Sequence, residues 1–205
     1  MYLNEIGLEI EMFLLDQKNN ILEPALFGFP ADEMGFLIEI RTHHSNTGKS
    51  VYESLCKNIE WNEKKAGKLG LKINIIPYMH VTNDFQNYIA NKYHHDRMAD
   101  QTRNIYGLKG SHHTGFCGDL ATAGMHVHFS SREIEGLSAK VIKLPVENIV
   151  KHMDEEFAQI IEDVHRLKGE YELKSHGFEY RSLPTTAPAQ KVITTSLKIL
   201  NDMVK

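Results

Sequence analysis

The chain has 205 residues, of which 41% are apolar and 24% are charged, a composition typical of a globular protein. Its formal net charge of −4 and its pI near 6.3 leave no basic footprint for nucleic acid or anionic membranes. Two cysteines are too few for a disulfide framework, and neither a signal peptide nor an apolar run of roughly 20 residues is present, so we expect one cytoplasmic domain over residues 1–205.

The first third of the chain predicts two strands and a helix. Alternating apolar residues bounded by turn residues predict strands at residues 6–15 and 36–42. A stripe of apolar residues predicts a helix over residues 50–69. Ser50 and Glu53 have the spacing of a capping box, which would begin this helix.

The middle of the chain predicts shorter elements and a loop. A β-type run at residues 71–76 is followed by a helix that we expect Asp84 to cap and that extends, with an interruption, toward Tyr106. Residues 107–118 contain four glycines and predict a loop. A third clear strand is expected at residues 122–131.

The last part of the chain predicts two helices around a strand. Apolar residues at helical spacing predict a helix over residues 145–168, a fourth strand follows at residues 176–183, and a final amphipathic helix begins at Pro188. Long strands that alternate with helices across long connections indicate an α+β domain, with the helices packed on one face of a mostly antiparallel sheet.

The four long strands share one design. Residues two apart in a strand point to the same face, and in each strand one face is apolar. The other faces carry Glu9, Glu11, Glu39, Arg41, His126, His128, Glu179 and Arg181. A solvated face would mix Lys, Thr, Ser and Gln, whereas these positions contain no lysine. Carboxylates and imidazoles ligate metals and guanidinium groups suit phosphates, so the pattern favours a functional site.

These strands resemble the glutamine synthetase and glutamate–cysteine ligase superfamily, and the similar segments occur in the order of that superfamily. The segments are Gly7-Leu8-Glu9-Ile10-Glu11, Leu37-Ile38-Glu39-Ile40, Gly124-Met125-His126-Val127-His128-Phe129-Ser130 and Phe178-Glu179-Tyr180-Arg181-Ser182-Leu183-Pro184. Residues 96–99 also resemble the glutamate–cysteine ligase branch. In size and style the chain is most similar to the short phage-type COOH–NH2 ligases, or amidoligases.

The resemblance implies a glutamine synthetase-like catalytic domain with a curved sheet that binds ATP and Mg²⁺ or Mn²⁺. It implies that one metal is held by Glu9, His126 and Glu179. A second metal would be held by Glu11 and Glu39, to which Glu33 is a weaker candidate addition. Glu179 and Arg181 would be catalytic, with Arg181 stabilising the transferred phosphoryl group. ATP would contact His126, His128 and Arg181, although packing is an equal alternative for His128.

The reaction implied by the resemblance joins a small-molecule or peptide carboxylate to an amine. A carboxylate is a poor electrophile, so it first receives the γ-phosphoryl group of ATP, and an amine then attacks the acyl phosphate. We expect the loop at residues 107–118 to be either a lid that excludes water or a plain connector. No nucleic-acid or membrane partner is expected, and the oligomeric state and the two substrates stay open.

Several alternatives stay open beside the ligase. A guanidino-group phosphotransferase would use a similar sheet, and a non-catalytic module would bind nucleotide or carboxylate without turnover. The spacing of His126 and His128 is also found in zinc hydrolases, which need further histidine or aspartate ligands from other strands. The adjacent pairs His43–His44, His94–His95 and His112–His113 are poor chelates, because neighbouring side chains diverge.

The chain also departs from the larger relatives. It begins almost on the first polar strand, so we expect none of the N-terminal domain with which glutamine synthetase completes a neighbouring site. Only Arg132 and Arg166 lie between the histidine strand and the Glu179 strand as candidates for further phosphate contacts. The amine pocket is therefore not predicted.

Overall fold

The computed structural model describes residues 1–93, 102–108, 116–163 and 166–204. It confirms an α+β architecture built on a nine-stranded sheet in which every described strand pair is antiparallel. The strands of this sheet are β1 (Tyr2–Leu15), β2 (Ile21–Leu22), β3 (Leu37–Arg41), β4 (Lys72–Asn74), β6 (Thr102–Asn104), β9 (Gly124–Glu135), β10 (Ser138–Val141), β11 (Glu170–Lys174) and β12 (Gly177–Pro184). The main path runs β2-β1-β9-β12-β11-β6; β3 and β4 pair with β1, and β10 pairs with β9.

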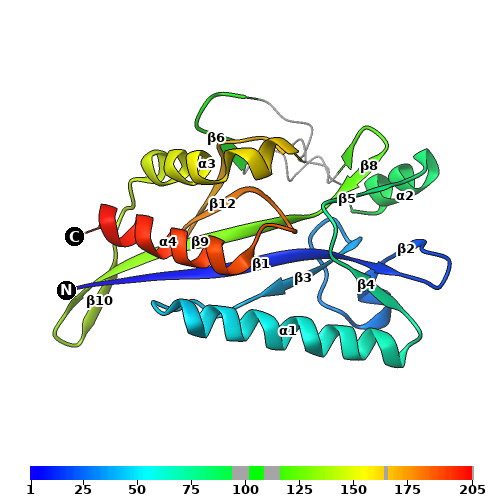
Figure 1. The fold of residues 1–205 in the computed structure, drawn as a ribbon, viewed down its shortest axis with the longest axis horizontal. Coiled ribbons are helices and arrows are strands. Elements are labelled where there is room, and N and C mark those ends of the chain that lie inside the picture. Colours follow the sequence, from blue (N-terminus) through cyan, green and yellow to red (C-terminus); the bar gives the residue numbers. More distant parts are fainter. Residues whose placement is uncertain (94–101, 109–115, 164–165, 205) are drawn as a thin grey trace.

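Helices and a second, smaller sheet surround this sheet. The helices are α1 (Gly48–Lys68), α2 (Asn83–Tyr93), α3 (Val146–Asp163) and α4 (Ala189–Met203), with a short 3-10 helix, η1, at Pro24–Phe27. The small sheet joins β5 (Tyr78–His80), β8 (Leu120–Thr122) and β7 (Phe116–Cys117). Figure 1 shows α3 above the long strands β1 and β9, α4 in front of them and α1 below them. No helix in the described ranges is long and apolar enough to cross a membrane.

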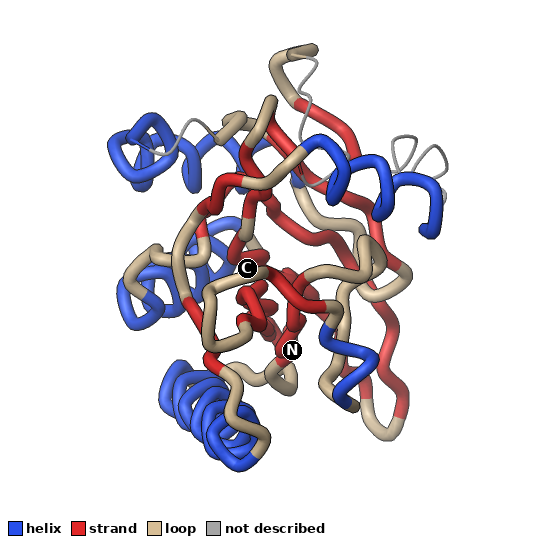
Figure 2. The backbone as a smooth tube through the Cα atoms, turned by 90° about the vertical axis from the view of Figure 1, so that its right-hand side faces the viewer, coloured by secondary structure: helices blue, strands red, loops and turns tan. Residues whose placement is uncertain are grey.

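The alternation of β1 assigns its two faces to different surroundings. Leu8, Ile10 and Met12 pack in the main core with apolar residues of α1, α3 and α4. Phe13 and Leu15, on the opposite face, pack in a second cluster with apolar residues of α2 and the small sheet. The prediction that helices cover one face is therefore right for α1, α3 and α4 and wrong for α2. Figure 2 shows the three stacked on one side of the twisted sheet and α2 on the other.

The ends of two helices differ from those predicted. Helix α1 begins at Gly48 after Thr47, so the capping box is wrong: Ser50 lies inside the first turn and its Oγ contacts His43 Nε2 at 2.7 Å. Its C-terminus is as predicted, because Gly70 adopts a φ of +67°. Asp84 is not the cap of α2, because the Oγ1 atom of Thr82 accepts the N–H of Phe85 at 3.2 Å.

The predicted helix toward Tyr106 is wrong at its far end, where residues 102–104 form β6 and pair with β11. The helix predicted over residues 145–168 begins one residue later and ends at Asp163. The bounds of the four long strands differ from the predicted bounds by at most four residues. Six of the strands that the sequence did not predict, β2, β5, β6, β7, β8 and β10, have two to four residues each, too short an alternation to detect. The seventh, β11, has five residues like β3, but only two of them are apolar, against three in β3.

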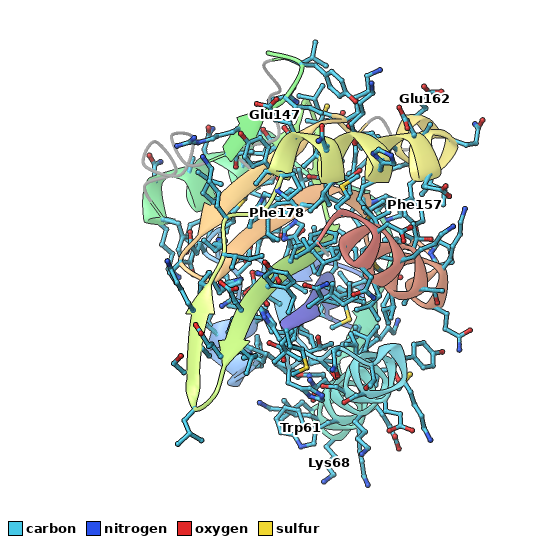
Figure 3. All side chains as sticks on the ribbon, turned by 90° about the vertical axis from the view of Figure 1, so that its left-hand side faces the viewer. Trp61, Lys68, Glu147, Phe157, Glu162 and Phe178 are labelled. Carbon is cyan, nitrogen blue, oxygen red and sulfur yellow. The ribbon has the colours of Figure 1, made fainter. Side chains whose placement is uncertain are left out.

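Phe178 of β12 lies on the apolar face of the sheet and is fully buried. Its ring stacks on Phe129 of β9 with centroids 4.9 Å apart, and it lies beneath α3 (Figure 3). Phe178→Ala would leave a cavity between sheet and helices, so we expect a loss of about 3–5 kcal/mol in the free energy of unfolding, measured by urea denaturation. Trp61→Ala is the control, since Trp61 is 59% exposed on α1, and it should cost less than about 1 kcal/mol. Equal losses in the two variants would contradict this core.

Candidate functional site

The register of the central strands brings the predicted polar residues together. Glu9 of β1 lies opposite Arg41 of β3 on one side and opposite His126 of β9 on the other. Glu11 lies opposite Glu39 in the same ladder, and His128 lies opposite Glu179 of β12. These side chains face away from the main core. The five of them other than the two histidines line a pocket, and His126 and His128 lie behind its carboxylates. The residues that line the pocket are Glu9, Glu11, Asp32, Glu33, Met34, Glu39, Arg41, Thr102, Arg166, Glu170, Glu172, Lys174, Glu179 and Arg181.

The centre of the site is a buried cluster of two carboxylates and two imidazoles. His126 Nδ1 lies 3.0 Å from an oxygen of Glu9 and 3.0 Å from an oxygen of Glu179. His128 Nε2 lies 3.3 Å from the other oxygen of Glu9. The side chains of His126 and Glu179 are 1% exposed and that of Glu9 is 3% exposed. Ligand atoms of Glu9, His128 and Glu179 lie within 4.8 Å of one another, close enough for all three to hold one ion.

A second group of carboxylates lies beside this cluster. An oxygen of Glu11 accepts the backbone N–H of Gly124 at 2.5 Å. Arg41 bridges the two groups, with its Nε 2.7 Å from Glu9 and its terminal nitrogen 2.6 Å from Glu39. Asp32 also lines the pocket, and its Oδ2 is buried with no hydrogen-bond partner among the described residues. The structure therefore adds Asp32 to the second group of carboxylates, beside Glu11 and Glu39.

Strand β11 supplies site residues that the sequence did not predict. Lys174 lies 2.9 Å from Glu179 and 2.6 Å from Glu172. Arg181 pairs with Glu179 and lies 3.4 Å from Glu172. The polar positions of the four long strands contain no lysine, but the neighbouring strand β11 adds Lys174 to the polar face. The alternation of residues 170–174 was the available signal, in a strand of only five residues.

Arg166 is a third arginine of the pocket. Its guanidinium donates a hydrogen bond to the backbone carbonyl of Arg181 at 2.9 Å. A Cβ atom at position 124 would lie 2.7 Å from the same guanidinium, so the glycine at the start of β9 leaves room for it. Arg132, the other arginine of this interval, pairs with Glu5 outside this pocket.

The acids of the site have pKa values shifted in opposite directions. Burial would raise the pKa of Glu9 and of Glu179, but hydrogen bonds from His126, and for Glu9 also from His128, hold both well below the usual range. Burial and the charges of Glu9 and Glu11 raise the pKa of Glu39 to about 8.

Two further groups of the site hold protons at neutral pH. Burial, and then Glu11, raise the pKa of Asp32 to about 7. Burial and Arg181 would lower the pKa of His126, but Glu11, Glu179 and Glu9 outweigh them and raise it to about 9. The site therefore balances part of its negative charge with bound protons.

Divalent cations are expected to displace these protons. Cations prefer ionised carboxylates and neutral imidazole, so binding of Mn²⁺ or Mg²⁺ at pH 7 should release protons from Asp32, Glu39 and His126. The release should fall as the pH is raised through 8 and 9, where Glu39 and then His126 are already deprotonated. Calorimetric titrations in two buffers with different enthalpies of ionisation measure the number of protons.

Glu39→Gln is the matched control for that experiment. It replaces one titrating carboxyl group with an amide of nearly the same size, so it should reduce the number of protons released. Cation binding at pH 7 without proton release would contradict the arrangement of the site.

Two histidines to which the sequence gave little or no weight lie beside His128. His44 follows β3, and His176 lies in the turn before β12. Burial, and then His128 and His176, lower the pKa of His44 to about 4. Burial and His128 also lower the pKa of His176. Both rings are therefore neutral at pH 7.

Some of the sequence-predicted features lie outside the described residues. These are the pairs His94–His95 and His112–His113, residues 96–99, and most of the loop at residues 107–118. Glu33 borders the pocket, but it is exposed and lies in the turn before β3 and not on one extended segment with Glu39.

Comparisons with known proteins give no match: no family model, no curated protein and no solved structure is similar to this chain. The chemistry of the site is therefore the basis for assigning a function.

Proposed function

We propose that this chain is an ATP-dependent carboxylate–amine ligase with a glutamine synthetase-like catalytic domain and that it acts in the cytoplasm. Its substrates would be ATP, a small-molecule or peptide carboxylate and an amine, and its products an amide, ADP and phosphate. One observation carries the proposal: Glu9, His126, Glu179 and Arg181 meet on three adjacent antiparallel strands. Those positions are also the ones that resemble the ligase superfamily.

The donor set fits divalent cations. The pocket is lined by eight carboxylic acids against three arginines and one lysine, an excess of negative charge in a partly buried site. Asp32 Oδ2 is buried without a partner in the described chain, which is the state of an oxygen available to a ligand. Oxygen ligands suit Mg²⁺ and Mn²⁺.

Two sets of residues would hold these cations. Glu9, His126 and Glu179 would hold one, and Glu11 and Glu39, with Asp32 beside them, would hold the other. When bound, the cations would neutralise the phosphate charge of ATP.

The arginines of the pocket are held at different positions, and two of them offer a fixed positive charge to phosphate. Arg181 is anchored by Glu179 and Glu172, which fixes its guanidinium beside the metal ligands. A guanidinium so held stabilises the charge that develops on a phosphoryl group in transfer. Arg166, held by the carbonyl of Arg181, adds a second fixed positive charge. Arg41 pairs with Glu9 and contacts Glu39 from the other side.

A coupled assay tests the proposal. The protein is incubated with ATP, Mg²⁺ or Mn²⁺, and pools of amino acids and amines, and both phosphate release and new amides are measured. We expect turnover only when a carboxylate and an amine are both present. A stable phosphoguanidine without phosphate release would instead indicate a guanidino phosphotransferase, and nucleotide binding without any turnover would indicate a binding module.

A further inference from the structure

Three histidines from separate segments meet at one end of the polar face of the sheet. His128 projects from β9, His44 follows β3 and His176 precedes β12. Their ring centroids lie 5.6 Å (His44–His128), 4.9 Å (His44–His176) and 5.5 Å (His128–His176) apart. One ring nitrogen of each lies within 4.8 Å of the others. The three imidazoles therefore converge on one point although they are far apart in the sequence.

A glycine is required to seat one of these rings. Gly7 of β1 lies opposite His128, and a Cβ atom at position 7 would lie 2.4 Å from Cδ2 and 2.9 Å from Nε2 of His44. Contacts that short do not occur, so any side chain at position 7 would push His44 away from His128. The Gly-x-Glu-x-Glu segment of β1 thus serves the imidazole cluster with its glycine and the carboxylate cluster with its glutamates.

Two of the three rings have a buried nitrogen that is left unsatisfied. His128 Nδ1 and His176 Nε2 are buried with no hydrogen-bond partner in the part of the chain that the structure describes. A buried polar atom without a partner destabilises the folded chain, so two in one cluster indicate a ligand.

Glu9 orients the central ring. His128 Nε2 lies 3.3 Å from Glu9, and an ionised carboxylate can only accept, so Nε2 carries the proton and Nδ1 carries the lone pair. A carboxylate behind a histidine is the usual arrangement around imidazole-bound metals, because it fixes the tautomer and makes the ring more basic.

We infer that His44, His128 and His176 bind one divalent transition-metal ion of the zinc class, at a site beside the carboxylate centre: His128 would bind the ion through Nδ1 and keep its Nε2 contact with Glu9 of that centre. Three imidazoles suit zinc, cobalt, nickel or copper, whereas Mg²⁺ prefers oxygen ligands. Zinc–nitrogen bonds of about 2.0–2.1 Å place the nitrogens of a tetrahedral site about 3.4 Å apart, so the rings need only a small rotation to close on an ion.

A hollow borders the histidine cluster. His44 and His176 border a pocket whose other walls are Glu5, Ser130, Arg132 and Val141. Glu5 is engaged by Arg132, which leaves the fourth ligand to water or to a small molecule that enters the hollow. Sites with three histidines and an open fourth position are typical of zinc ions with a chemical role.

Cobalt is the probe that distinguishes the two sites. Metal-free protein is titrated with Co²⁺ in the presence of saturating Mg²⁺, which occupies the carboxylate centre, and visible absorption reports four- or five-coordinate cobalt bound to imidazole. We expect one Co²⁺ per chain, displaced by one Zn²⁺. His44→Ala and His176→Ala should each weaken binding by at least about 100-fold and remove the visible band. Both residues are half-buried and lie outside helices and strands, and circular dichroism verifies the fold of each variant.

The controls are chosen on either side of the cluster. His43→Ala, next to His44 but exposed and bonded to Ser50, should bind Co²⁺ as the parent does. Glu39→Gln, in the carboxylate centre, should also leave the band unchanged. Retention of the band in His176→Ala, or its loss in Glu39→Gln, would overturn the proposal, as would binding that is weak and does not saturate. None of these results depends on ligase activity, so the two proposals fail separately.

Discussion

Glu9→Gln is expected to lower the rate of ATP-dependent amide formation by about 10²–10³-fold while the chain stays folded. Glu9 is the residue on which the site converges: its two oxygens contact His126 at 3.0 Å, His128 at 3.3 Å and Arg41 at 2.7 Å. Glutamine has the same size but no charge. An NH2 group, which is a donor, replaces one carboxylate oxygen and would face other donors. The variant would therefore lose a metal ligand and the pairing of three neighbours at once.

Initial rates of phosphate release at saturating ATP and Mg²⁺ measure this effect. The matched control is Glu133→Gln, since Glu133 is an exposed glutamate of β9 outside the pocket, and its rate should stay within a factor of two or so of the parent. A Glu9→Gln variant with more than a tenth of the parent rate would contradict the role of Glu9.

Arg181→Lys is expected to reduce kcat by a similar factor, about 10²–10³, with a much smaller change in KM for ATP. Lysine keeps the positive charge but loses the planar guanidinium: one terminal nitrogen of Arg181 contacts both Glu179 and Glu172, and lysine has no second nitrogen with which to bind a phosphoryl group at the same time. The lost interaction is one made with the phosphoryl group in the transition state, so binding of ATP in the ground state should change little.

Chemical rescue separates this role from a structural one. Millimolar guanidine added to Arg181→Ala should restore part of the rate, because the small cation can occupy the vacated position. Arg103→Lys, an exposed arginine on β6, is the matched control and should have parent kinetics. A rise in KM for ATP together with the fall in kcat, and no rescue by guanidine, would indicate that Arg181 acts only by supporting the fold.

The faces of the four long strands could be predicted because alternation is a local property. Glu9, Glu39, His126 and Glu179 lie on strands of 5 to 14 residues whose apolar positions fix which side is buried. The structure brings these residues together on one face of the sheet, as that alternation indicated. Their proposed roles as metal ligands stay predictions.

Other parts of the site depend on contacts that no local pattern encodes. Lys174 belongs to β11, a five-residue strand with only two apolar residues, and Arg166 reaches the pocket from a segment with no regular structure, past a glycine at position 124. His44 was discounted as one of an adjacent pair, yet only one member of a pair needs to face a site. It reaches His128 because Gly7 lies on the strand between them.

Helix starts were missed for a related reason. Thr47 and Thr82 precede helices whose first turns contain other polar residues, Ser50 and Asp84, with equally good capping spacing. Which residue caps a helix depends on where tertiary packing fixes the helix, and sequence spacing alone does not decide between neighbours.

The fate of the carboxylate oxygen tests the central claim most directly. The protein is incubated with ATP, Mg²⁺ and a pool of amino acids whose carboxylate groups carry ¹⁸O, and the released phosphate is analysed by mass spectrometry. If the carboxylate attacks the γ-phosphorus and an amine then expels phosphate, the bridging oxygen leaves with the phosphate, so each phosphate should contain one ¹⁸O atom. Phosphate without ¹⁸O, or an amide formed with release of AMP, would contradict an acyl-phosphate ligase.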